Sequence, residues 1–173
     1  MSKQTPALHD PQKIRGMFRL QLTEDEDGKT KVVGDSGWHE NQITNVGFLN
    51  MVNQLGTSLT GSKISHAALG TGTVPASSDT TLNGEVYTNG SSSVVRAALT
   101  AATSSSSKTL RNTATFASSV SFITAAANIS NVGLFQTSGP ATSNGSLLQG
   151  NTYASSSLAT NQNVNLTYDL IFS

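Results

Sequence analysis

The clearest pattern in the sequence is an alternation of apolar and polar positions near its C-terminal end. The apolar positions are Val164, Leu166, Tyr168, Leu170 and Phe172, and polar residues or Asp169 separate most of them. Successive side chains of a strand point to opposite faces, so a period of two over ten residues predicts a strand with one buried face. Shorter apolar runs that predict further strands lie at 64–69, 94–99, 110–116, 120–123, 132–135 and 147–148.

One segment has the spacing of a helix instead. Within residues 43–55, the apolar residues that recur at helical intervals are Val46, Leu49, Val52 and Leu55. Thr44 or Asn45 can cap its start, and Gly56 can end it. We expect this short helix to turn its apolar stripe, widened by Phe48 and Met51, towards the core.

These elements predict a mainly β fold, an antiparallel β-sandwich or jelly-roll-like domain with one short helix at about 43–55. A chain of 173 residues is long enough for one such domain with a real core. Only 12% of its residues are charged, and small polar residues are abundant, as in the turns and strands of β domains. The sequence has no faithful internal repeat and no sustained heptads, so it does not predict a fibre shaft.

The charged residues are distributed unevenly along the chain. Thirteen of the twenty Asp, Glu, Lys and Arg residues lie in residues 1–40, although the formal net charge is zero. Pro6 and Pro11 disfavour a helix at the start of this region. We therefore predict two regions, a charged N-terminal arm and hairpin at 1–40 and a β-rich body at 41–173.

Within the arm, residues 17–22 and 31–33 predict a hairpin whose turn contains Glu24, Asp25, Glu26, Asp27 and Gly28. The acidic turn lacks the Asp-x-Asp-x-Asp-Gly spacing and closing Glu of a calcium loop. We interpret it as a solvated turn, and we expect the arm to contact a neighbouring subunit.

The residue types that carry chemistry are few and scattered. The chain has no Cys, and His9, His39 and His66 do not have the spacing of metal ligands. No Gly-x-Ser-x-Gly nucleophile elbow is present, and Asp79, Glu85 and Asp169 are the acids of the predicted body. The Gly70–Thr73 run lacks the third Gly of a dinucleotide fingerprint and the Gly-Lys of a phosphate loop, so it predicts a close-packed turn. We expect no enzyme activity, no catalytic residue, no cofactor and no metal.

The composition also limits the classes of partner that we expect. A net charge of zero and a pI of about 6.8 do not favour nucleic acid or an anionic membrane as a partner. No apolar window is long enough to span a bilayer, and no signal peptide precedes the polar start. These features predict a protein that is made in the cytoplasm.

The order of the segments resembles a family of tailed-phage virion proteins. Residues 67–82 read AALGTGTVPASSDTTL and are followed by Glu85, which is similar to that family's ALGTGT-x-PA-x-SDT-x-L-x-x-E stretch. Residues 129–135, ISNVGLF, and the terminal strand resemble two further family elements. The sequence departs from the family at Asn131, where an acid is usual, and after Glu85, where an Arg is usual.

The resemblance implies a non-catalytic structural component of a phage virion, assembled in the host bacterial cytoplasm. We favour a capsid decoration or cement protein that bridges coat subunits and forms a homo-oligomer such as a trimer. A tail, collar or baseplate component that anchors a fibre is the alternative within the same class. A carbohydrate-binding module is the alternative from another class, because β-sandwiches often bind glycans through exposed aromatic residues.

Overall fold

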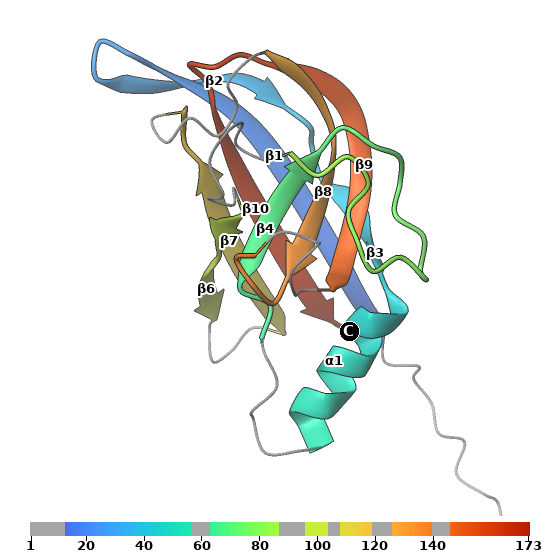
Figure 1. Cartoon of the computed structure of the whole chain (residues 1–173). Coiled ribbons are helices and arrows are strands. Elements are labelled where there is room, and N and C mark those ends of the chain that lie inside the picture. The colour runs from blue at the N-terminus through green and yellow to red at the C-terminus, as the bar shows by residue number, and fades with distance from the viewer. Residues whose placement is uncertain (1–12, 57–62, 87–95, 104–107, 119–125, 140–145) are drawn as a thin grey trace, which may run out of the picture.

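A computed structural model shows that the described part of the chain folds into one antiparallel sheet of ten strands with a single helix (Figure 1). The structure describes residues 13–56, 63–86, 96–103, 108–118, 126–139 and 146–173. The elements are β1 (Ile14–Glu26), β2 (Lys29–Asp35), β3 (His39–Ile43), α1 (Asn45–Gly56), β4 (His66–Gly70), β5 (Ala97–Ala98), β6 (Thr100–Thr103), β7 (Thr109–Phe116), β8 (Ala127–Phe135), β9 (Leu147–Leu158) and β10 (Asn163–Phe172).

The sheet curls until its two ends nearly meet. Its strand order is β5-β4-β8-β9-β3-β1-β10-β7-β6, and β2 pairs with β1 outside this path. On one side, β3 joins two layers because it pairs with both β1 and β9. On the other side the layers are joined by residues 97–103, since β5 pairs with β4 and β6 pairs with β7. The expectation of a mainly β, antiparallel fold with one short helix is confirmed.

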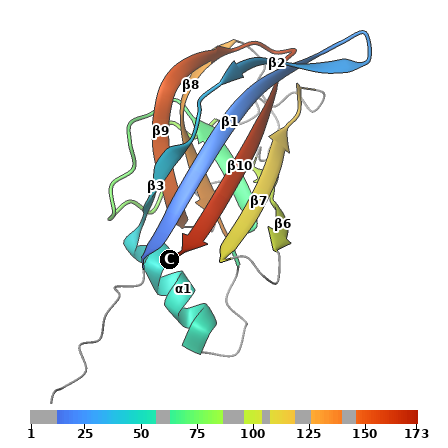
Figure 2. The same cartoon turned by 180° about the vertical axis from the view of Figure 1, so that it is seen from behind.

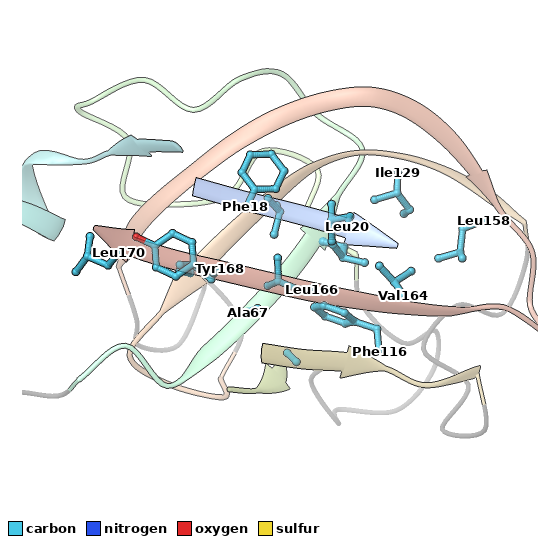
Figure 3. Close-up of a cluster of buried hydrophobic side chains, with 14 of the residues drawn as sticks. Phe18, Leu20, Ala67, Phe116, Ile129, Leu158, Val164, Leu166, Tyr168 and Leu170 are labelled. Carbon is cyan, nitrogen blue, oxygen red and sulfur yellow. The ribbon is translucent and has the colours of Figure 1, made fainter. Parts of the chain in front are cut away.

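The core lies between the two layers, where apolar side chains from both meet (Figure 3). The terminal strand β10 contributes the buried residues Val164, Leu166, Tyr168 and Leu170. Its alternation therefore identified the buried face correctly, except that Phe172 is 41% exposed at the end of the strand. The predicted run at 120–123 and residues 94–95 lie outside the described residues.

A small polar cluster interrupts this core. The buried Tyr168 hydroxyl donates to Oε1 of Gln149, and Nδ2 of Asn41 donates to the same oxygen at 2.9 Å. Gly16 leaves room for the cluster, because a Cβ there would lie 2.9 Å from the Tyr168 hydroxyl. Burial raises the pKa of Tyr168 far above its usual value, so its hydroxyl stays protonated and can donate.

The charge distribution predicted an N-terminal region distinct from the body, but the two share one sheet. β1 pairs with β10 from Ile14 to Thr23, and its Phe18 and Leu20 are buried in the core. The predicted boundary at residue 40 therefore does not follow the sheet. The charge count was misleading because many of its residues occupy the outer face of β1 and the hairpin, while the inner face of the same strand is apolar. Residues 1–12 lie outside the described residues.

The predicted hairpin is confirmed. Glu26 pairs with Lys29, so Asp27 and Gly28 form a two-residue turn, and both have positive φ values of 50° and 73°. This is the backbone that an Asp-Gly hairpin turn favours. Figures 1 and 2 show the hairpin reaching beyond the sheet at one end and α1 projecting from the other end.

Candidate functional site: a pinned loop and an inverted helix

The segment that carries the family resemblance forms a loop, residues 70–86, that is pinned at several points. Asp79 accepts a hydrogen bond from the Ala76 amide at 2.8 Å, and Leu82 is buried. The Gly70–Thr73 turn is also close-packed as predicted, because a Cβ on Gly72 would lie 2.3 Å from the Asn83 carbonyl oxygen. The loop is therefore built to hold one shape.

Asn131 on β8 fastens the two arms of this loop together. The buried side chain donates through Nδ2 to the carbonyl oxygens of Thr73 at 3.2 Å and Asn83 at 2.9 Å. An ionised carboxylate has no proton to donate to these carbonyls. An amide at this position can therefore bond to both carbonyls, whereas an ionised acid could not.

The loop ends at a buried ion pair that the sequence did not reveal. Arg96 donates to both carboxylate oxygens of Glu85, at 2.7 Å and 3.0 Å, and the two side chains are 0% and 1% exposed. The Arg96 guanidinium also lies 3.5 Å from the centre of the Phe135 ring and donates to the Thr137 carbonyl at 3.2 Å. Arg96 therefore supplies the cation that balances the buried Glu85 carboxylate.

The remaining acids of the predicted body and the described histidines are held at separate places. Asp169 accepts from Arg111 at 2.7 Å and 2.6 Å, and Asp79 serves as a turn cap.

The His39 ring stacks on Phe18 with ring centres 5.5 Å apart, and Nδ1 of His66 lies 2.8 Å from the Ser65 hydroxyl. Burial, followed by the nearby Arg96 charge, lowers the pKa of His66. Within the described ranges, no three His, Cys, Asp or Glu residues gather as metal ligands would. His9 lies outside the described residues.

A shallow recess lies where the hairpin meets strands β8 and β9. It is lined largely by core residues such as Leu20, Ile129 and Leu158, with Tyr153 and Ser156 at the side of β9. Asp35 also lines it, but its carboxylate accepts from Arg19 and from the Gly37 amide. The recess is thus mainly an opening into the core.

Helix α1 is anchored firmly at its first turn. The buried Thr44 is the N-cap, since its hydroxyl accepts from the Gly47 amide at 3.0 Å. The same oxygen lies 2.7 Å and 2.9 Å from the carbonyl oxygens of Leu147 and Leu148 on β9. Gly47 allows this close approach, because a Cβ there would lie 2.0 Å from the Leu148 oxygen. The start of the helix is therefore fixed to the sheet.

Beyond the first turn the apolar side of α1 faces outwards. The exposed fractions rise along the helix, from 47% at Phe48 through 59% at Leu49 and 62% at Val52 to 88% at Leu55. The expectation that this stripe packs onto the core was wrong for these four residues, whereas Met51 does pack against the core. Helical spacing shows which side chains share a face, but it does not show which face the rest of the chain covers.

The inner side of α1 is small and polar. Asn50 is only 8% exposed and accepts a hydrogen bond from Gln54 Nε2 at 2.6 Å, and Gly47 lies on the same side. A surface helix of a globular protein normally has the opposite arrangement, with apolar residues inside. We call α1 an inverted helix for this reason. It contains no charged residue from Asn45 to Gly56.

The opposite end of the molecule is charged. The hairpin tip carries Glu24, Asp25, Glu26, Asp27, Lys29 and Lys31. Beside it, Arg19 holds Asp35 in a bidentate contact, and this contact keeps the pKa of Asp35 well below its usual range. Val32 and Val33 on β2 are 51% and 41% exposed. The two projections therefore differ in chemistry, one being charged and the other apolar.

Comparisons with family models, with curated proteins and with solved structures gave no significant match for the chain. Among the described residues, α1 is too short to cross a membrane.

Proposed function

We propose that this protein is a structural component of a tailed-phage particle, and specifically a capsid decoration protein that bridges coat subunits. The observation that carries the proposal is the inverted helix. Exposed apolar patches on soluble proteins commonly mark contacts with other proteins, and α1 places four large apolar side chains in water. A protein that acts by being held against other subunits needs such a surface.

The arrangement of the two projections supports a bridging role. The hairpin and α1 lie at opposite ends of one rigid sheet (Figures 1 and 2). A contact made by one end is therefore held at a fixed distance from a contact made by the other. Repetition of such contacts by the symmetry of a shell makes individually weak interactions strong in total.

The pinned loop supports the same class of function. Its close-packed glycines, its Asn131 bonds and its Glu85–Arg96 pair are directed at each other and at the backbone. We infer that the main role of this segment, which carries the resemblance, is to keep the loop in one conformation. We also propose that the protein is not an enzyme.

Gold labelling of the protein on intact particles of the source phage tests the proposal. Label distributed over the heads is the expected result. Label confined to the tail or its collar would favour the alternative of a component that anchors a fibre. Particles without label, together with saturable binding of the purified chain on a glycan array, would overturn the virion proposal in favour of a carbohydrate-binding module.

A further inference from the structure

We propose that Asn83 is a site of spontaneous covalent modification, which the pinned loop suppresses while it is closed and which makes an opening of the loop irreversible. Asn83 is exposed, and Gly84 follows it directly. An asparagine before a glycine is especially prone to deamidation, because glycine has no side chain to hinder attack by its own backbone nitrogen. The inference goes beyond the proposed function and does not depend on it.

The reaction needs only the chain itself and water. The backbone nitrogen of Gly84 bonds to Cγ of Asn83, the Cγ–Nδ2 bond breaks, and Nδ2 leaves as ammonia with the proton that Gly84 loses. The product is a succinimide ring. Water then adds to one of the two ring carbonyl carbons and reopens the ring. One opening gives an aspartyl residue, and the other gives an isoaspartyl residue, whose main chain runs through the former side chain.

The turn at Asn83 holds the reacting atoms apart. The Glu85 amide donates to the Leu82 carbonyl at 3.3 Å, so Asn83 and Gly84 are the central residues of a β-turn. Gly84 has a positive φ of 65°, and Asn83 is not among the residues with positive φ, which makes this a type II turn. There ψ of the first central residue is about +120°, which places the Gly84 nitrogen roughly a third of a turn from the Asn83 Cβ. Ring closure requires these two atoms to be nearly eclipsed.

Contacts around Asn83 oppose the rotation that ring closure requires. Its carbonyl oxygen accepts from Nδ2 of the buried Asn131 at 2.9 Å. The same oxygen packs so closely on Gly72 that a Cβ there would lie 2.3 Å from it. A change in ψ of Asn83 moves this oxygen and breaks both contacts. We therefore expect the ring to form only in open loops, at a rate that follows the fraction of loops that are open.

The isoaspartyl product does not fit the closed loop. It adds a carbon atom to the main chain at position 83, where the contact with Gly72 has no room for one. Asn131 also fixes the spacing of the two arms, because its Nδ2 bonds to the carbonyl oxygens of both Thr73 and Asn83. A lengthened arm cannot keep this spacing, so a loop that has reacted stays open.

A proteolytic peptide allows the modification to be measured at Asn83 alone. Two further Asn-Gly pairs, at 89–90 and 144–145, lie outside the described residues. Cleavage after Lys63 and Glu85 releases residues 64–85, in which Asn83 is the only Asn or Gln. The mass gain that accompanies conversion of an amide to an acid, measured on this peptide, therefore reports Asn83.

The first test compares folded and unfolded chains in mildly alkaline buffer. We expect Asn83 to be modified at least roughly tenfold more slowly in the folded chain than in a chain unfolded in guanidinium, because the hydrogen bonds that hold the loop must first open. Equal rates would show that the loop gives no protection. An unmodified peptide from the unfolded chain would show that Asn83 is not a reactive site. Either result would overturn the proposal.

The second test loosens the loop by substitution. Asn131→Ala removes both bonds that fasten the arms, and two bonds of ordinary strength correspond to a roughly tenfold to hundredfold rise in the open fraction. We expect the modification rate at Asn83 in the folded variant to rise by the same factor. Val164→Ala is the matched control, because it removes buried methyl groups from β10 and no hydrogen bond of the loop. No acceleration in Asn131→Ala, or an equal acceleration in both variants, would contradict the inference.

A milder variant covers the case in which Asn131→Ala does not fold. Ser130→Ala removes the single bond from the Ser130 hydroxyl to the Gly72 carbonyl, which is 3.0 Å long. It should accelerate the modification at Asn83 in the same direction and by a smaller factor. A folded Ser130→Ala chain that reacts at the natural rate would count against the role of the loop contacts.

The irreversible opening is tested on the modified chains themselves. Ion exchange separates chains that have gained the acid, and fragmentation of peptide 64–85 identifies the isoaspartyl form. Amide hydrogen exchange over residues 70–86 should be fast in these chains and slow in Asn83→Asp, which carries the same charge without the lengthened main chain. Equal protection in the isoaspartyl chains and in Asn83→Asp would show that the modified loop closes again.

Discussion

The Glu85–Arg96 pair and the inverted helix α1 depart from the usual distribution of side chains in opposite directions. The pair places two charges in the interior, and the helix places a row of apolar side chains outside. The buried pair is satisfied within the chain, by two ion-pair hydrogen bonds, a carbonyl and an aromatic ring. The apolar face of α1 has no comparable cover among the described residues.

This difference separates two tasks within one domain. The buried pair and its loop make the fold specific, because a wrong arrangement would leave a charge without its partner in the interior. The outer face of α1 is exposed, so it buries little apolar surface within one copy and should add little to its stability. Substitutions at the two places should therefore affect different measurements, and the following predictions use that separation.

The largest effect is expected from Arg96→Met. This substitution leaves the Glu85 carboxylate buried without its cation, which should cost about 3–5 kcal/mol of the free energy of unfolding. Chemical denaturation measures the loss, and the midpoint temperature of thermal unfolding should fall by roughly 2–4 °C for each kcal/mol lost. The double variant Glu85→Leu with Arg96→Met should recover most of it. If Arg96→Met is as stable as the natural chain, the pair has no structural role.

An intermediate effect is expected from Thr44→Ala, which lies where the folded body meets the helix. Loss of the hydroxyl leaves the Gly47 amide without its cap and should cost about 0.5–2 kcal/mol. If α1 contacts the particle as proposed, Thr44→Ala should also weaken binding of the purified chain to particles, because the helix is less firmly fixed. Thr44→Ser keeps the hydroxyl and is the control for both the unfolding measurement and the binding measurement. Equal behaviour of the Ala and Ser variants would show that the cap does not anchor α1.

The smallest effect is expected from His66, beside the buried pair. Its folded pKa is lowered, so the unfolded chain takes up the proton more readily. Stability should be full above about pH 6.5, the usual pKa of histidine, and should fall as the pH drops below it. Unfolding midpoints at about pH 7.5 and pH 5.5 measure this, and His66→Gln should reduce the difference. The lowered pKa of Asp35 acts in a separate window, as the pH falls below about 4.

The sequence was a good guide wherever one strand faced both core and solvent. The alternation in β10 and the Asp-Gly turn of the hairpin could be interpreted directly, because local backbone geometry determines them. The position of α1 was predicted to within two residues at its start. Its orientation was not, because Gly47 and the buried Asn50 form contacts that only the path of β9 makes possible.

The partners of the buried polar groups also could not be predicted from the sequence. Arg96 and Glu85 are eleven residues apart and meet beside β4, because Glu85 forms a bridge with Gly70 and the strand after Arg96 pairs with β4. A signal was nevertheless present, since lone charges in a charge-poor region are rarely buried unless they are paired. The division at residue 40 failed for a related reason. Charge along the chain does not report which strands become neighbours, and β1 lies beside β10 at the other end of the sequence.

The hairpin turn has a practical consequence for engineering. Asp27 and Gly28 lie at the tip of a projection whose strands are paired with each other, at the end of the molecule away from α1. Exposed loop tips of this type tolerate inserted peptides well. A foreign epitope placed between these two residues would point away from the helix, whereas one added after Ser173 would emerge beside Lys13, close to the base of the helix. The tip is therefore the position of choice for displaying a cargo on this scaffold.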